Sequence, residues 1–416
     1  MLYRQRLIAE LDKCRGEFVE FGREWAAEAA DYAGRLAGLE GRAVADVRRE
    51  AEANLAEVRA RAFGSLPSGE LEREGRFVLP FGRRWRTHEE ARGWAVDALV
   101  DRATFAADGS QILPGREVSM PVAAVQVAWF ENPHARDGAG YRKEWDFRLV
   151  TPKELSETDA GPATATDLVS LHRFELELKA VRAFLERRAG WRARGERVPV
   201  AFFDGTLLLS TARMRGESLS FPSGYVKALA ETIRLSRETE VPVVGYIDQS
   251  YARDLVRLLD VLARRERRTP VVFDAQIFSA ETREGAPPLF ANWGDRTVFC
   301  HCFREGLPED FRDEANEPLV GFVYLQTTAP GGVPARLDIP AWVGQDAALL
   351  EDVIDAVRAE CVVGNGYPYA LETADEAAVI TARDREQFLR AVQDFAETNQ
   401  LAFRVSRKAV SKIHRR

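Results

Sequence analysis

Hydrophobic and polar positions along this chain follow patterns that predict a mixed α/β protein. Apolar runs of strand length occupy residues 103–107 and 198–203, and each run ends in an aspartate. Further strands are expected over 117–130 and 145–149, where short turns predict antiparallel pairing with the first strand. After these strands and before residue 198, apolar residues at helical spacing predict a helix from about 166 to 188. Helices and strands continue to alternate after residue 203, which is typical of a mixed sheet core with flanking helices.

The first part of the chain predicts a long helical arm. Apolar residues recur near helical spacing through Leu7, Leu11, Phe18, Phe21 and Trp25, and no proline precedes Pro67. Residues 1–63 are therefore expected to form one long helix or a helical hairpin. We assign residues 1–65 as an arm that serves as a spacer or in dimerisation, and residues 66–400 as the main domain.

The C-terminal residues 401–416 form a basic tail. Six lysines and arginines and no acidic residue lie between Arg404 and Arg416. Such a tail can contact phosphates, or it can be a solvated terminus.

Bulk composition narrows the class of protein. The chain has 416 residues and a formal net charge of −7, which argues against a generally basic surface for nucleic acid. It contains no apolar run of about 18 residues, so we expect no transmembrane helix. The N-terminus is amphipathic and lacks an apolar signal segment, which predicts a cytoplasmic protein. Four cysteines are too few and too scattered for a disulfide framework.

The two aspartate-ending strands carry matching motifs, Ala-Ala-Asp-Gly-Ser around Asp108 and Phe-Phe-Asp-Gly-Thr around Asp204. Removing an ionised carboxylate from water is costly unless a cation or several donors compensate it. Two carboxylates from distant parts of the chain could share a divalent metal ion. Since Asp-Gly is also a common turn dipeptide, the motifs alone leave both interpretations open.

Two further segments offer candidate ligands. The helix at 166–188 carries Glu175 and Glu177 on the two flanks of its apolar stripe. The segment Gly-Asn-Gly-Tyr-Pro-Tyr at 364–369 predicts a tight turn that contains Tyr367 and precedes a helix starting near Thr373. Asp375 is then expected in the first helical turn, where the helix dipole favours an anion.

Other possible sites carry less weight. Cys300, His301 and Cys302 are soft metal ligands, but on a strand the cysteines and the histidine face opposite ways, so we interpret this segment as an ordinary strand. The sequence contains neither a phosphate-binding P-loop nor a dinucleotide-binding glycine fingerprint.

Taken together, four segments resemble the NurA nuclease family. They are the Asp-Gly motif at 107–110, the helix around Arg173–Glu177, the Asp-Gly motif at 203–207, and Gly366-Tyr367-Pro368 with the helix that follows. Each motif is short, but their order and spacing agree over residues 90 to 385, which is most of the chain.

The resemblance implies an RNase H-like core and a manganese-dependent active site, with magnesium as a possible substitute. It implies 5′-to-3′ exonuclease and single-strand endonuclease activity on DNA, in end resection during double-strand break repair. It also implies a homodimer that works with a HerA-type hexameric translocase.

By motif position, the resemblance makes Asp108 and Asp204 metal-binding aspartates. Glu177 corresponds to the helix glutamate, with Glu175 as the alternative, and Tyr367 corresponds to the family's tyrosine. The family usually has a histidine eight residues after that tyrosine, where this chain has Asp375. An aspartate can bind manganese through oxygen but supplies no imidazole nitrogen.

Two other functions remain open at this point. A non-catalytic DNA clamp or translocase adaptor of the same fold is favoured by the replacement at Asp375 and disfavoured by the intact Asp108 and Asp204. An actin-like ATPase ranks last, because its phosphate turns place a residue between the aspartate and the glycine, whereas Asp108-Gly109 and Asp204-Gly205 are adjacent.

Overall fold

The computed structural model describes residues 3–115, 118–138, 140–157, 162–209, 222–266, 271–279 and 289–402. The chain divides into two compact units. Unit 1 comprises residues 1–87, 246–307 and 312–350, and unit 2 comprises residues 88–245, 308–311 and 351–416. The division into arm, main domain and tail stays a prediction, and residues 403–416 of the expected tail lie outside the described residues.

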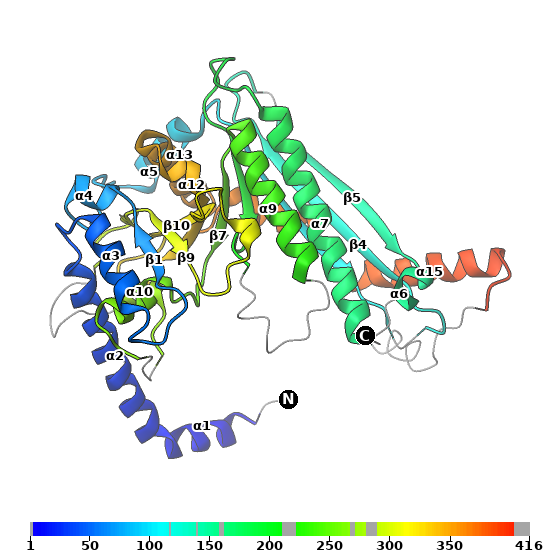
Figure 1. The fold of residues 1–416 in the computed structure, drawn as a ribbon. Coiled ribbons are helices and arrows are strands. Elements are labelled where there is room, and N and C mark those ends of the chain that lie inside the picture. Colours follow the sequence, from blue (N-terminus) through cyan, green and yellow to red (C-terminus); the bar gives the residue numbers. More distant parts are fainter. Residues whose placement is uncertain are drawn as a thin grey trace. The chain divides into compact units, whose positions relative to one another are not determined.

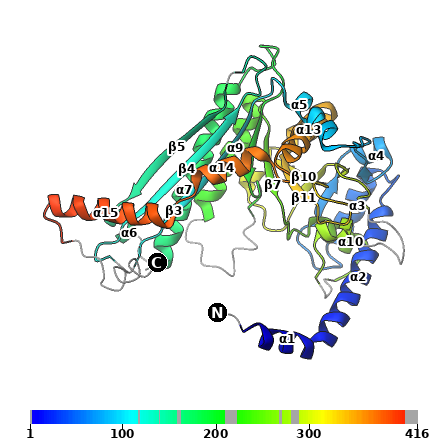
Figure 2. The same ribbon diagram turned by 180° about the vertical axis from the view of Figure 1, so that it is seen from behind.

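The helices and strands of the chain are drawn in Figure 1 and, from behind, in Figure 2. Those of unit 1 are α1 (Arg4–Lys13), α2 (Arg15–Ala37), α3 (Val44–Asn54), β1 (Gly64–Pro67), α4 (Glu70–Glu74), β2 (Val78–Leu79), α10 (Asp254–Leu262), α11 (Asp274–Ser279), β8 (Arg296–Thr297), β9 (Cys300–Phe303), β10 (Val320–Leu325), β11 (Ala335–Pro340) and α12 (Ala341–Gly344).

Those of unit 2 are α5 (His88–Leu99), β3 (Thr104–Ile112), β4 (Ala123–Asn132), β5 (Arg142–Val150), α6 (Pro152–Ser156), α7 (Pro162–Arg188), β6 (Val200–Asp204), α9 (Pro222–Thr239), the 3-10 turn η1 (Glu309–Phe311), α14 (Tyr369–Ala378) and α15 (Ala382–Thr398). Two elements, β7 (Val243–Ile247) and α13 (Ala347–Val363), contribute residues to both units.

Unit 1 is built on antiparallel strands in the order β1-β9-β10-β11, with β2 paired to β8 and β8 to β10. Cys300 and Cys302 are buried on β9 while His301 points to the other side and is partly exposed. The expectation of an ordinary strand at this position is therefore confirmed. The expected N-terminal arm is helical but is broken near Cys14 and between residues 38 and 43, so it forms three helices.

Unit 2 confirms the mixed α/β class. Strands β3, β4 and β5 form an antiparallel meander, and β6 pairs with β3 in parallel. Figures 1 and 2 show α7 and α9 on one side of these strands and α14 on the other. Ring contacts agree with this arrangement, because Phe105 stacks on Phe184 of α7 and Phe130 meets Tyr369 of α14. The RNase H-like assignment within this class stays a prediction.

A buried carboxylate fixes the start of α14. Glu360 on α13 is 1% exposed, and its Oε2 accepts a hydrogen bond of 2.9 Å from the backbone N–H of Ala370, in the first turn of α14. Pro368 precedes the helix and supplies a backbone that favours helix initiation. Because of these two features, α14 begins at Tyr369, four residues before the expected start near Thr373.

The burial of Glu360 predicts a pH-dependent stability. Burial raises its pKa to about 7 from an ordinary value of 4.5, against the opposing hydrogen bond from Ala370. The nearby His134, whose Nε2 lies 3.8 Å from Glu360 Oε1, has its own pKa lowered by burial. Between pH 4.5 and about pH 7, the unfolded chain releases the proton of Glu360 while the folded chain retains it. The free energy of unfolding therefore falls as pH rises through this range.

We therefore expect Glu360→Gln to become more stable relative to wild type as pH rises from 5 to 8, by on the order of 3 kcal/mol. Urea unfolding at both pH values measures this difference. The comparison removes the contributions of other titrating groups, since these are common to both proteins. Stability differences that are equal at pH 5 and pH 8 would contradict an uncharged Glu360 in the native state.

Candidate active site

The parallel pairing of β3 and β6 brings the two expected aspartates together. In this register Phe105 lies opposite Ala201 and Ala107 opposite Phe203, so Asp108 and Asp204 occupy the next positions on adjacent strands. Because side chains alternate along a strand, both carboxylates project to the same face of the sheet, the face that packs against α14. Asp108 is partly buried, and Asp204 at the end of β6 is exposed.

Tyr367 contacts this pair. Its hydroxyl donates a hydrogen bond of 3.1 Å to Asp204 Oδ1. The preceding turn is tight: a Cβ on Gly364 would lie 2.1 Å from the carbonyl oxygen of Tyr367, and Gly366 adopts a φ of +111°. Both positions require glycine, and they hold the tyrosine against the end of β6.

Asp375 reaches the site from the middle of α14. The expectation that it lies in the first helical turn was wrong, because the helix begins at Tyr369. The helix dipole consequently gives Asp375 no special support. Its exposed carboxyl group instead lies beside Asp108.

Electrostatics mark Asp108 and Asp204 as a strained pair of anions. Burial raises the pKa of Asp108 to about 6, the N–H of Gly109 opposes this, and Asp375 and Asp204 raise it further. Desolvation and the charge of Asp375 also raise the pKa of Asp204, against the hydrogen bond from Tyr367. Such mutual repulsion is relieved by protons or by a cation between the groups.

Glu177 lies nearby on α7, which covers the other face of the sheet. It is 6% exposed, and burial raises its pKa to about 7, with the charges of Asp108 and Asp204 adding to the increase. Arg173, one helical turn earlier, donates a hydrogen bond of 2.7 Å to Glu177 Oε1 and another of 3.3 Å to the carbonyl oxygen of Gly109. The alternative, Glu175, lies instead 3.4 Å from Nδ1 of His172.

Gly109 makes this approach possible. A Cβ at that position would lie 2.6 Å from Glu177 Oε1 and 2.8 Å from Cγ of Arg173. β3 continues to Ile112, so the expectation that Asp108 ends its strand was wrong, and the Asp108-Gly109 dipeptide has a packing role and not a turn role. Arg173 was not predicted as a site residue, although its spacing of four residues from Glu177 is the usual spacing of a helical ion pair.

Carboxylate oxygens are hard donors, which suit manganese or magnesium. As the side chains stand in the described residues, no three His, Cys, Asp or Glu groups are spaced to hold one ion. Glu177 faces Arg173, so it would have to turn toward the aspartates to become a ligand. The chemistry of the donor set therefore fits a divalent cation, and the spacing requires a side-chain rearrangement.

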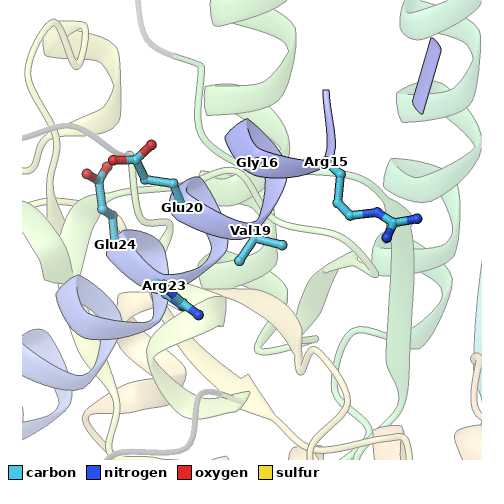
Figure 3. A pocket seen from close by; sticks show the side chains of 6 residues that line it. All are labelled: Arg15, Gly16, Val19, Glu20, Arg23 and Glu24. Carbon is cyan, nitrogen blue, oxygen red and sulfur yellow. The ribbon is translucent and has the colours of Figure 1, made fainter. Parts of the chain in front are cut away.

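A separate surface hollow lies in unit 1 and contains none of these residues. It has a volume of about 660 Å³, and all its lining residues belong to α2 (Figure 3). They are Arg15, Gly16, Val19, Glu20, Arg23 and Glu24. A hollow formed by one helix, with mixed charges, offers no convergent set of catalytic groups.

Comparison with known families identifies the family of this chain. The family model described as the NurA domain matches residues 102–380, a segment that contains Asp108, Glu177, Asp204, Tyr367 and Asp375. The chain belongs to the NurA family. This is a family of nucleases, and membership supports a hydrolase that binds DNA and functions in DNA repair.

Other comparisons add little. No curated protein matches the chain. Among solved structures, the C-terminal lobe of a budding yeast Argonaute aligns at 12% identity with a TM-score of 0.26, over 73% of this chain and 52% of that one. The alignment thus spans about half of that structure's length, and a TM-score this low supports no argument about fold or function. Among the described residues, no helix is both long and apolar enough to span a membrane.

Gly109→Ala tests the packing of Glu177. The new methyl group would displace Glu177 and Arg173, so we expect DNA cleavage to fall about 100-fold, the scale of loss for a misplaced catalytic group. Gly93→Ala is the matched control, since a Cβ there meets nothing within 4 Å. Cleavage rates on end-labelled DNA and thermal melting measure the two effects. Full activity in a folded Gly109→Ala protein would show that this packing is dispensable.

Tyr367→Phe removes only the hydroxyl that bonds Asp204. We expect cleavage to fall about 10-fold, because a hydrogen bond to a charged group contributes roughly 1.5–3 kcal/mol. The neighbouring Tyr369→Phe serves as the control. The hydrogen bond has no functional role if the two variants cleave DNA equally fast.

Proposed function

We propose that this protein is a metal-dependent DNA nuclease that uses Mn²⁺, with Mg²⁺ as a possible substitute. The observation that carries the proposal is the convergence of Asp108, within β3, and Asp204, at the end of β6, on adjacent parallel strands near Asp375 and Glu177. A structural role gains nothing from placing repelling carboxylates side by side. A site that binds a cation and a phosphate requires them.

Each residue has a proposed role in this site. Asp108, Asp204, Glu177 and Asp375 hold the metal ions, and Asp375 replaces the histidine expected from the family with an oxygen donor. A bound divalent cation would supply Lewis acidity and lower the pKa of a water molecule for attack on the scissile phosphate. Tyr367 fixes the orientation of Asp204 and lies where it can also orient the phosphate.

Arg173 has a second proposed role. Its guanidinium neutralises Glu177 in the structure as it stands. When Glu177 turns toward the aspartates, the guanidinium is released and can meet a phosphate oxygen. Arginine suits such a contact because its charge and planar donors match phosphate.

The finer activities follow from the family resemblance. We propose 5′-to-3′ exonuclease and single-strand endonuclease activity in end resection during double-strand break repair. The proposal includes an RNase H-like core, a homodimer, a HerA-type hexameric translocase as partner, and action in the cytoplasm.

A non-catalytic DNA clamp or adaptor remains the second candidate. It is favoured by one observation, that no three candidate ligands in the described residues are yet spaced for a single ion. The intact pair of aspartates argues against it.

Paired variants on α7 and the strands test the proposal. We expect Asp108→Asn, Asp204→Asn and Glu177→Gln each to lower Mn²⁺-dependent cleavage of single-stranded DNA by at least about 100-fold, because each loss removes several kcal/mol of transition-state stabilisation. EDTA should abolish wild-type cleavage. Glu175→Gln is the matched control from the same helix and should retain activity. A folded wild-type protein that binds DNA but never cleaves it, with or without the translocase, would favour the clamp.

A further inference from the structure

A cluster of aromatic rings and arginines lies in unit 1, outside the candidate active site. The loop at 80–87 reads Pro-Phe-Gly-Arg-Arg-Trp-Arg-Thr and contains three arginines and no acid. Phe81 and Trp85 from this loop meet Trp293, with ring centroids 5.2 to 5.8 Å apart. Arg83, Arg84 and Arg86 of the same loop are exposed.

The rings are held in place by buried polar contacts. Asp295 is 2% exposed; its Oδ1 accepts the N–H of Phe81 and its Oδ2 accepts the N–H of Asn292. The indole N–H of Trp293 donates a hydrogen bond of 3.0 Å to the carbonyl oxygen of Thr327. The carboxylate of Asp295 therefore connects the loop at 80–87 to the segment that carries Trp293. These contacts fix the positions of the rings before any ligand binds.

Gly294 makes room for the cluster. It adopts a φ of +82°, and a Cβ there would lie 2.6 Å from the ring of Phe81. Phe81 packs against the backbone at this point and forms the base of the cluster. Trp85 and Trp293 are half-buried and meet at an interplanar angle of 57°, so neither indole covers the face of the other completely.

We propose that this cluster, Phe81, Trp85 and Trp293 with Arg83, Arg84 and Arg86, is a binding site for single-stranded DNA. Partly exposed indoles can stack on nucleobases without regard to sequence, and arginines can pair with the phosphates between the bases. A loop that only closes a hydrophobic core has no use for three exposed arginines. The proposal rests on the proposed function only in taking DNA as the ligand, because the cluster shares no residue with the candidate active site.

Binding of a fluorescein-labelled 20-mer of thymidine, measured by anisotropy in EDTA, tests the site without cleavage. Trp85→Ala should weaken binding about 10-fold, within the range for loss of one stacked base. Trp85→Phe, which keeps an aromatic face, should recover most of the affinity. Trp145→Ala, which removes a tryptophan that is 71% exposed on β5, is the matched control and should bind as wild type does.

A second probe separates stacking from charge. A 20-mer with abasic residues keeps the phosphates but has no bases, so wild type should bind it more weakly than thymidine, and Trp85→Ala should bind it as wild type does. Arg83→Ala should reduce the slope of log affinity against log salt by about 0.7, the value for one phosphate contact on a single strand. Equal binding of thymidine by wild type, Trp85→Ala and Arg83→Ala would overturn the proposal.

The two proposals can fail separately. A protein that loses thymidine binding in Trp85→Ala but never cleaves DNA leaves the binding site standing and removes the nuclease. If the protein cleaves DNA through Asp108 while Trp85→Ala and Arg83→Ala bind thymidine normally, the nuclease stands and the binding site is removed.

Discussion

The parallel pairing of β3 with β6 is the constraint on which the candidate site depends. It brings Asp108 and Asp204, which lie 96 positions apart in the sequence, to adjacent positions on one face of the sheet. The long connection through α7 is what a parallel pair requires, and it places Glu177 over the same strands. A change of one residue in this register would turn one carboxylate to the opposite face.

Negative charge is concentrated around Asp108 and Asp204, and this concentration lowers the local stability of the fold. Burial and the charges of neighbouring carboxylates raise the pKa values of Asp108, Asp204 and Glu177, against the N–H of Gly109 and the side chains of Arg173 and Tyr367. Perturbed carboxylates that cluster in this way are typical of functional sites. The glycines at 109, 364 and 366 allow the close approaches that the cluster needs.

Much of this arrangement could be predicted from the sequence, because apolar runs and helical periodicity are local signals. The antiparallel meander, α7 and the strand that ends at Asp204 follow from them, whereas β3 continues past Asp108 to Ile112 because it pairs with β4 over its whole length. The start of α14 could not be predicted, since it is set by Glu360, a residue ten positions away that caps Ala370 from another helix. Burial likewise distinguishes Glu177 from Glu175, and no local pattern carries that information.

Mn²⁺ binding measured by electron paramagnetic resonance tests the central claim most directly, because it needs neither DNA nor catalysis. We expect wild type and Glu175→Gln to bind Mn²⁺ alike, and Asp108→Asn and Asp204→Asn each to weaken binding, since both carboxylates serve one site. Wild-type affinity in a folded Asp204→Asn protein would contradict this claim, because the parallel pair would then not form a shared metal site.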